Sequence, residues 1–476
     1  MKKLLLASLL AAALGTIGAD AEGLARYALS NGLELYVLRD ASTPLARMQL
    51  AFKAGGIAQS AETAGRFRLL ERSLLRQSDQ GLPSPVAVSL AGLGATALDG
   101  GTYADGMSYW FTIPSSLLAQ GLGFWATAFA GSAAQVVEVE AAIGESLAAA
   151  SDPAAIFRAA LDKRLFPKYP WRLDLLGSEQ TLRGATAPSL EALRSLWLVP
   201  ANAALFVGGD VDPETVRAEA ERAFSKWKAA PDPWNKPLAP QAKPGVARPT
   251  WIVYPDPSLP EGLGAVEARY RGPDPAADPA ASMAARLWSA LAADPAGRFK
   301  AALTKDLPGL QGAGSIAAAY VARRDSSYLA VGAYFVVDPA SPSADRARLF
   351  KERVRGFELT AMKADPARYF GPAEIEAAKA RLLREREAAT DDAEGAIAAL
   401  AEDWLVSSVD QNLGFAAALA KTGAAELAAF LDSYFMKNLE VVSLRMNPVD
   451  HERERKSLAN SGFELVTASN AFWWKK

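Results

Sequence analysis

Three charged side chains within one short segment are the residues of this sequence best placed to act together. In the segment Ser60 to Arg76, SAETAGRFRLLERSLLR, leucines recur at helical spacing and the second part contains neither glycine nor proline, which predicts a helix. Arg68, Glu71 and Arg72 then stand at positions i, i+3 and i+4 and project from one face. A carboxylate between two guanidinium groups is ordinarily a solvated row of ion pairs, and the local pattern by itself favours that interpretation.

Histidine, which commonly binds zinc and acts as a general base, is almost absent. The chain contains one, His451, in the charged run HERERK near the C-terminus, where we expect it to be exposed to solvent. A single histidine cannot form a His-based zinc site by itself. Since the chain also lacks cysteine, its residues effectively exclude Ser-His-Asp and Cys-His hydrolytic sites.

The composition is that of a globular protein too long for one compact core. The chain has 476 residues, of which 50% are hydrophobic and 22% charged, so two or more domains are expected. The formal net charge is −2, and no basic stripe with interleaved aromatic residues is present. The composition therefore argues against nucleic-acid binding.

The N-terminus has the parts of a secretory signal peptide, which we assign to residues 1–21. Lys2 and Lys3 are followed by an apolar run to about Gly18 and by the small-x-small site Ala19-Asp20-Ala21. The apolar run is short for a bilayer span, so a retained anchor is the less favoured alternative. No later segment approaches a membrane span. The signal type predicts export across the inner membrane to the periplasm.

The remaining chain divides into two halves with a similar order of elements. We assign residues 22–228 to an N-terminal domain, the proline-rich stretch 229–249 to a linker, and residues 250–476 to a C-terminal domain. Each half begins with strands, continues with amphipathic helices and returns to a strand. The predicted fold class is α+β, with two similar α/β-sandwich halves that each pack helices on a mixed or antiparallel sheet. In the first half, strands are expected at 27–38 (a hairpin around Asn31-Gly32), 48–53, 107–113 and 203–208.

These elements, together with short motifs, resemble the pitrilysin/insulinase family of zinc metallopeptidases in its two-domain form, similar to mitochondrial processing peptidase subunits. The resemblance extends from about Tyr27 to about Pro448 and depends on the order and spacing of motifs that are weak singly. The motifs are Asn31-Gly32-Leu33, Ala54-Gly55, Gly65 with Leu69-Leu70-Glu71, Tyr109 with Pro114, Leu176-Gly177, Pro200-x-Asn202, Gly209-Asp210-Val211-Asp212-Pro213, and Glu374 with Lys379.

The resemblance implies that the zinc site has degenerated. The family carries a His-x-x-Glu-His motif and a third ligand, a Glu, on a later helix; here Arg68 and Arg72 occupy the two His positions, Glu71 the general-base position and Glu145 the third-ligand position. A guanidinium stays protonated and has no lone pair to donate to a metal. We therefore expect no zinc, no other cofactor and no catalytic residue at this site.

The charge count suggests a replacement for the metal ion. Two arginines with two glutamates are neutral, as Zn²⁺ with two carboxylates is, so Arg68 and Arg72 are expected to bridge Glu71 to Glu145 and join the two helices. The alternative is that Glu145 is a surface residue and that its spacing is a coincidence.

Positions that contact substrate in the family are also altered. Asp99-Gly100 stand where the family commonly has an Asn-Ala pair that contacts the substrate backbone. Lys305 and Gly312 stand where the second domain usually supplies an Arg and a Tyr. Lysine could keep the charge without a bidentate contact, and glycine cannot replace a tyrosine.

The leading functional prediction is a catalytically inactive, exported homologue of these peptidases that pairs with an active peptidase subunit of the same family, as a homo- or hetero-oligomer. The alternatives are a stand-alone peptide-binding or structural assembly protein and, less favoured, an active metalloendopeptidase with an unusual site. The apolar C-terminus, Phe472 to Lys476, is expected to pack on the second domain, with contact to a membrane or a partner as the alternative.

Overall fold

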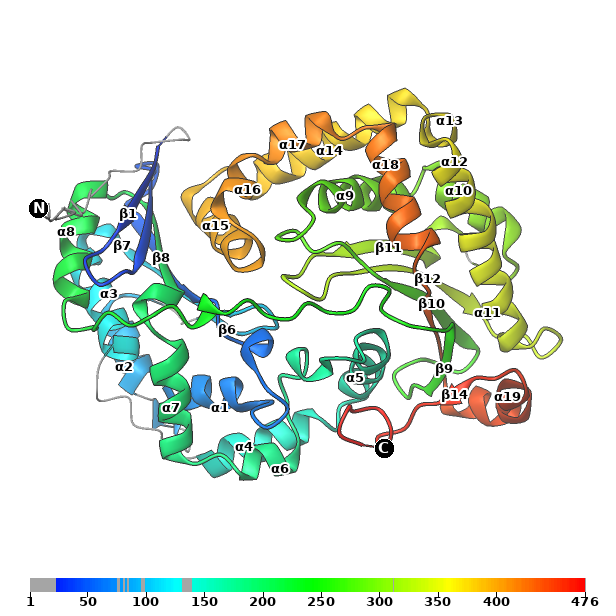
Figure 1. The fold of residues 1–476 in the computed structure, drawn as a ribbon, viewed down its shortest axis with the longest axis horizontal. Helices are drawn as coiled ribbons and strands as arrows, with labels where there is room; N and C mark the ends of the chain where they lie inside the picture. Colours follow the sequence, from blue (N-terminus) through cyan, green and yellow to red (C-terminus); the bar gives the residue numbers. More distant parts are fainter. Residues whose placement is uncertain are drawn as a thin grey trace, which may run out of the picture.

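The computed structural model describes residues 23–74, 78–79, 82–83, 85–95, 99–130, 139–310 and 312–475. The predicted signal peptide, residues 1–21, lies outside these residues. The described chain forms two six-stranded sheets, one in each half of the sequence, which lie beside each other (Figure 1). The predicted fold class is therefore confirmed.

The N-terminal sheet has the strand order β1-β2-β8-β3-β7-β6. Only β2 and β8 run parallel, with Leu35 opposite Leu205, while the other neighbours are antiparallel. The predicted hairpin around Asn31-Gly32 is present as β1 and β2, with a longer loop than expected. The strands are β1 (Leu24–Ala28), β2 (Glu34–Arg39), β3 (Leu45–Phe52), β6 (Asp99–Thr102), β7 (Met107–Pro114) and β8 (Ala203–Gly209), with a separate two-stranded pair formed by β4 (Ser78–Asp79) and β5 (Leu82–Pro83).

The C-terminal sheet has the order β11-β12-β10-β13-β9-β14. Its strands are β9 (Thr250–Pro255), β10 (Leu263–Arg271), β11 (Ile316–Val321), β12 (Tyr328–Val336), β13 (Val441–Met446) and β14 (Glu464–Leu465). Five strands repeat the N-terminal topology, because β9-β13-β10-β12-β11 have the same order and relative directions as β2-β8-β3-β7-β6. The two halves are thus built on one plan, although the sixth strands, β1 and β14, differ.

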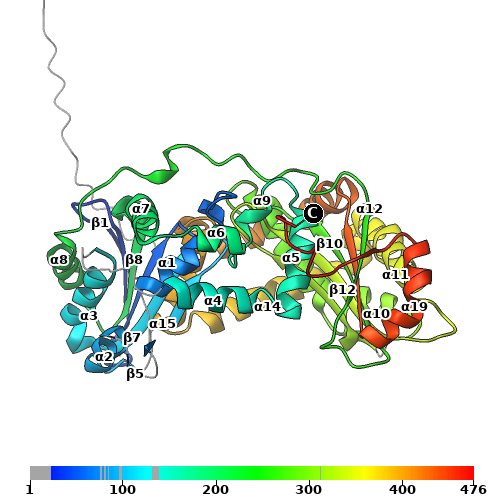
Figure 2. The same ribbon diagram turned by 90° about the horizontal axis from the view of Figure 1, so that it is seen from below.

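Most helices cover the outer face of the sheet in their own half (Figures 1 and 2). Apolar residues of β3, β7 and β8 form the N-terminal core with those of α1, α3 and α8, and a corresponding core fills the C-terminal half. The N-terminal helices are α1 (Arg66–Leu74), α2 (Pro85–Gly92), α3 (Leu118–Trp125), α4 (Val139–Ala149), α5 (Pro153–Leu165), α6 (Glu179–Arg183), α7 (Ala187–Trp197) and α8 (Pro213–Phe224). The C-terminal helices are α9 (Pro279–Ala293), α10 (Arg298–Asp306), α11 (Ser343–Lys351), α12 (Thr360–Ala364), α13 (Pro366–Phe370), α14 (Pro372–Ala389), α15 (Ala393–Val406), α16 (Val409–Leu413), α17 (Phe415–Lys421), α18 (Ala424–Leu431) and α19 (Pro448–Asn460), with a π-helical segment at Glu352–Leu359 between α11 and α12.

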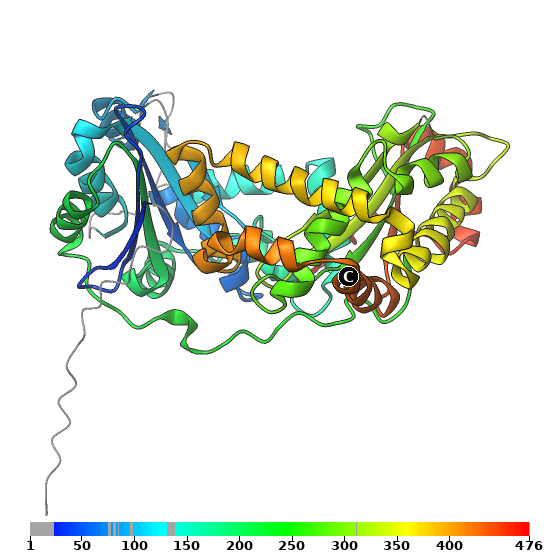
Figure 3. The same ribbon diagram turned by 90° about the horizontal axis from the view of Figure 1, so that it is seen from above.

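Each half also contributes one helix to the other half. Helix α15 packs on the inner face of the N-terminal sheet, where Ile397 and Trp404 meet Phe206 in one apolar cluster (Figures 1 and 3). Helix α5 packs on the inner face of the C-terminal sheet, where Leu161 meets Val441. These helices occupy equivalent places in the chain, since each lies between the antiparallel hairpin of its half and the following parallel strand. The exchange covers both faces of β3 and β8, which explains why these strands are buried almost throughout.

Two expectations for the C-terminal region had different outcomes. The prediction that His451 is exposed was wrong: its exposed fraction is 7%, because it lies one turn into α19 on the face that Leu458 also shares. Burial lowers the pKa of its imidazole.

The apolar C-terminus packs on the protein as predicted, with Phe472 buried in the cluster around α5. The Trp473 indole also donates to Asp174 of the N-terminal half at 2.8 Å.

Candidate functional site

Helix α1 forms as predicted and presents Arg68, Glu71 and Arg72 away from the core. Its other face holds it in place, since Phe67, Leu69 and Leu70 are completely buried. The helix begins after Gly65, which has φ +83°, and a Cβ at that position would lie 2.8 Å from the carbonyl oxygen of Leu176. Only glycine can adopt this positive φ and also allow the close approach of the Leu176 carbonyl without strain. The start of the helix is therefore fixed against the segment around Leu176.

Glu71 is half-buried between α1 and the edge strand β6. Its Oε2 atom accepts a hydrogen bond from the Thr102 backbone N–H at 2.8 Å, and a Cβ at Gly101 would lie 3.6 Å from Oε1. Burial raises the pKa of the Glu71 carboxyl, against the opposing effects of the Thr102 hydrogen bond and of the charges on Arg68 and Arg72. Among the described residues no cation lies within ion-pair distance of Glu71, so the expected bridge from the arginines to Glu71 is not formed.

The bridge to the later helix is formed by Arg72. Its Nη1 atom pairs with Oε2 of Glu145 on α4, as the sequence-based hypothesis requires. Glu145 is also a surface residue, with 65% of its side chain exposed against 27% for Arg72. Because such exposed pairs contribute about 0–1 kcal/mol, the contact orients the two side chains more than it stabilises the fold.

Arg68 forms neither of these contacts and borders a cavity instead. It lines a cavity of about 430 Å³ between α1, α5, the segment that follows Pro170 and the C-terminal residues Phe472 and Trp473. The structure thus separates the three charged residues of α1: Glu71 faces β6, Arg72 reaches α4, and Arg68 borders this cavity.

Comparison with known proteins relates one part of the chain to a protein family and the whole fold to several solved structures. Residues 184–357 match the family model described as Peptidase M16 inactive domain. This segment of the chain is therefore M16-like. No curated protein matches its sequence.

Solved structures share the M16 fold over most of the chain at low identity. A protease from Helicobacter pylori is 15% identical with a TM-score of 0.74, over 89% of this chain and 99% of that one. A peptidase M16 inactive domain from Pseudomonas fluorescens is also 15% identical, with a TM-score of 0.70 over 89% and 98% of the two chains. The periplasmic protease PqqL from Escherichia coli is 16% identical with a TM-score of 0.65, and 94% of this chain aligns with 51% of PqqL.

The other positions suggested by the family resemblance are dispersed in the structure. Asp99 is exposed at the start of β6, where its Oδ1 accepts from the Gly100 N–H at 2.7 Å. Lys305 is exposed on α10, and Gly312 precedes β11 with φ +100°. Helix α10 lies in the C-terminal half at a distance from α1 in both views (Figures 1 and 2). The structure therefore brings Asp99, but neither Lys305 nor Gly312, to the edge strand beside Glu71.

A polar contact between the two halves was not suggested by the sequence. The loop after β6 and the equivalent loop after β11 meet, and the Arg324 backbone N–H donates to Oδ1 of Asp105 at 2.9 Å. Beside it, Arg172 of the N-terminal half donates to Asp325 at 2.5 Å, and both side chains are largely buried. No motif indicated these residues, because their partners lie more than a hundred positions away along the chain.

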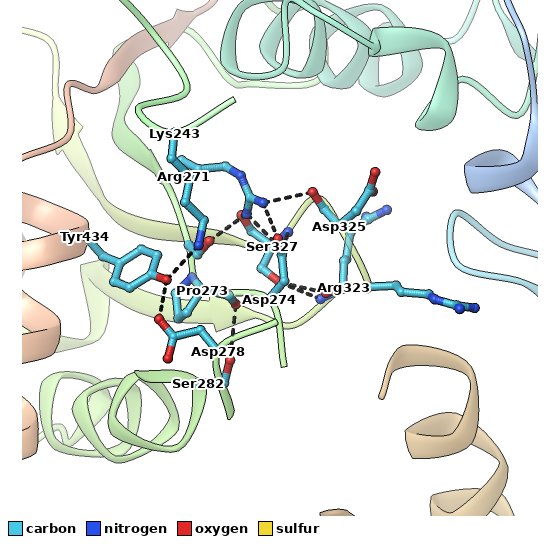
Figure 4. Close-up of polar contacts among 12 residues, drawn as sticks. Lys243, Arg271, Pro273, Asp274, Asp278, Ser282, Arg323, Asp325, Ser327 and Tyr434 are labelled. Carbon is cyan, nitrogen blue, oxygen red and sulfur yellow. Dashed lines mark hydrogen bonds and ion pairs between the residues drawn. The ribbon is translucent and has the colours of Figure 1, made fainter. Parts of the chain in front are cut away.

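A buried network behind the C-terminal loop holds it in place (Figure 4). Arg271 is completely buried, and its guanidinium donates to Asp274 at 2.9 Å and to the Ser327 carbonyl at 2.9 Å. Figure 4 also shows a second chain of contacts, in which the Lys243 ammonium donates to the Tyr434 hydroxyl at 2.9 Å. This hydroxyl in turn donates to Asp278 at 2.7 Å. Since both Nη atoms of Arg271 have partners and only its Nε has none, the network is best explained as structural support for the loop that meets Asp105.

The Asp105 contact predicts a pH-dependent stability. Burial raises the pKa of Asp105 to about 6 from 3.8, although the charge of Arg323 opposes the shift. The folded chain therefore binds this proton more tightly than the unfolded chain, and the stabilisation this provides is lost as the pH rises through about 6. Asp105→Asn keeps an acceptor for the Arg324 N–H and removes the buried charge, so it should stabilise the protein by about 2–3 kcal/mol at pH 7.5.

Urea unfolding of both proteins at pH 7.5 and pH 5.0 measures this effect. The gain should shrink at pH 5.0, where Asp105 is mostly protonated in the folded state. Asp391→Asn, at an exposed position, is the matched control and should change the free energy of unfolding little at either pH. A loss of stability in Asp105→Asn at pH 7.5 would show that the ionised carboxylate is needed.

The part of the chain that the structure describes contains no cluster of three or more His, Cys, Asp or Glu side chains arranged to hold a metal ion. Within the same residues, no helix combines the length and the apolar character that crossing a bilayer requires.

Proposed function

We propose that this protein is an exported M16-type homologue that binds peptides without cleaving them and works as a non-catalytic subunit beside an active peptidase of the same family. The observation that carries the proposal is the placement of two arginines where the family resemblance expects imidazole ligands. Arg72 also engages Glu145, the remaining candidate ligand, in an ion pair.

The residues present do not fit a zinc ion. A protonated guanidinium offers no lone pair, so Arg68 and Arg72 cannot coordinate a metal. Their positive charges would also repel a cation from Glu71 and Glu145, which by themselves are too few ligands for tight zinc binding. The family description of an inactive domain and the similar P. fluorescens structure of that description agree with a protein that has lost hydrolysis.

Peptide binding is supported by the edge of the N-terminal sheet. Among the described residues, strand β6 pairs only with β7, so no strand covers its other side, where side-chain carboxylates of Asp99 and Glu71 accept from the backbone N–H groups of Gly100 and Thr102. An extended peptide can add to such an edge as a further strand. The open edge also favours the second candidate function, a stand-alone peptide-binding protein, since this mode of binding needs no partner subunit.

Three further observations support the proposed periplasmic location and the proposed partner subunit. The N-terminal sequence has the charged start, apolar run and small-x-small site of a secretory signal, and PqqL, a structural neighbour, is a periplasmic protease. Another neighbour is a chain of complex III from Candida albicans, so this fold also occurs in a multi-subunit assembly.

The test is purification of the tagged chain from its native envelope fraction, followed by metal analysis, a peptide-cleavage assay and identification of any associated chain. We expect no zinc and no cleavage by the chain alone, together with a co-purifying chain that has an intact His-x-x-Glu-His motif. A chain that elutes alone on size exclusion and still binds peptides would support the stand-alone function. Stoichiometric zinc with cleavage that is lost in Glu71→Gln would overturn the proposal.

A further inference from the structure

The cavity beside Arg68 has the size and surroundings of a ligand site. Its volume of about 430 Å³ lies within the range of small-molecule pockets, and α5 forms one wall along its length. Leu173, Leu175 and Phe472 contribute an apolar part. The C-terminal segment runs beside α5 (Figure 2), and Trp473, whose indole donates to Asp174, also lines the cavity.

The acidic residues that line this cavity are already engaged. Asp152 caps α5 by accepting from the Ala154 and Ala155 N–H groups at 2.8 and 3.2 Å. Asp174 accepts from the Trp473 indole at 2.8 Å and from two backbone N–H groups. Asp162 lies 4.0 Å from the guanidinium of Arg269. Burial raises the pKa of Asp162, and that of Asp174 to about 6, so these two carboxyl groups carry less negative charge than exposed ones at slightly acidic pH.

Of the three basic residues that line the cavity, one has hydrogen-bond partners and two have none among the described residues. Lys163 donates to the backbone carbonyls of Asn470 and Lys475 at 3.0 and 2.8 Å. Arg68 and Arg158 line the same cavity, and neither has an ion-pair or side-chain hydrogen-bond partner among the described residues. Two guanidinium groups next to an apolar wall are complementary to an anionic group attached to an apolar body, and a carboxylate is the anion that peptides carry.

We propose that this cavity binds a carboxylate of a peptide, held by Arg68 and Arg158, with the adjoining apolar part of the peptide against Leu173, Leu175 and Phe472. This inference rests on the peptide binding in the proposed function and adds the chemical class that the site selects. Arg68, which replaces a family metal ligand, thereby acquires a role in anion recognition. The carboxylate comes from an acidic side chain or from the C-terminus of the peptide.

Fluorescence anisotropy with three labelled peptides of one apolar sequence tests the proposal on the full mature chain. One peptide has an internal Glu and an amidated C-terminus, the second has Gln and a free C-terminus, and the third has Gln and an amidated C-terminus. At least one carboxylate peptide should bind about tenfold more tightly than the neutral peptide. The peptide that shows the preference identifies the source of the carboxylate.

The variants Arg68→Gln and Arg158→Gln locate the effect in the cavity. Each should remove most of the preference for the carboxylate and leave the affinity for the neutral peptide unchanged. Arg183→Gln, at an exposed arginine that is paired with Glu179, is the matched control and should keep the preference. Circular dichroism confirms that each variant is folded.

The outcomes separate this inference from the proposed function. Equal affinity for all three peptides, or a preference that survives in both cavity variants, overturns the inference and leaves peptide binding intact. No binding of any peptide overturns both. A preference that is lost in the cavity variants and retained in Arg183→Gln establishes the site.

Discussion

Replacing Trp404 with alanine should destabilise the whole protein by about 3–5 kcal/mol, the usual cost of removing a large buried aromatic side chain. Trp404 belongs to α15 in the C-terminal half, but its ring packs edge-on against Phe206 of the N-terminal sheet at 6.1 Å between centroids. It is 3% exposed, and its indole N–H donates to Oε2 of Glu34 at 3.0 Å. The Lys53 ammonium lies 4.1 Å from the ring centroid. The substitution therefore removes apolar packing, a hydrogen bond and a cation–π contact together.

Urea unfolding followed by circular dichroism measures this loss. Because α15 and α5 are exchanged between the halves, we expect one shared transition that moves to lower urea concentration in the variant. Leu196→Ala, at a position that is 56% exposed on α7, is the control and should cost about 0.5 kcal/mol or less. Two separate transitions, with only the later part of the chain affected, would show that the helix exchange does not couple the halves.

The double substitution Arg68→His with Arg72→His should produce a protein that binds one zinc ion per chain. Residues 68 and 72 are four apart on α1, so both imidazoles would project from one face, and the ion pair of Arg72 shows that the Glu145 carboxylate reaches this position. Two imidazoles and one carboxylate are a common set of protein ligands for zinc, with a fourth position left open. We expect the parent chain to hold no stoichiometric zinc under the same conditions.

Metal analysis after dialysis against a zinc buffer measures the gain. Glu145→Gln in the double variant removes the carboxylate ligand and should weaken zinc binding strongly, while Glu140→Gln, a neighbouring exposed glutamate on α4, should leave it intact. Zinc bound at one per chain by the parent protein would contradict the proposed loss of the metal site. Failure of the double variant to bind zinc would show that the three positions do not converge.

Features set by short stretches of chain could be predicted from the sequence. The leucine spacing in α1 placed three charged residues on one helical face, because a helix repeats every three to four residues and its faces follow from the sequence alone. The Asn31-Gly32 turn indicated the first hairpin for the same local reason. That Arg68 and Arg72 replace imidazole ligands stays a prediction from the family resemblance.

Features that depend on contacts between distant segments were decided by the tertiary structure. The periodicity of α15 shows that it has an apolar face but does not say which sheet covers that face, and the fold pairs it with the opposite half. His451 is buried because α19 turns it inward, although its neighbours in the sequence are charged. Arg172 and Asp325 pair across 153 positions, and Arg68, Arg158 and Phe472 line one cavity although they are far apart in the sequence. Such contacts are selected by the packing of whole elements against each other, which local spacing in the sequence does not encode.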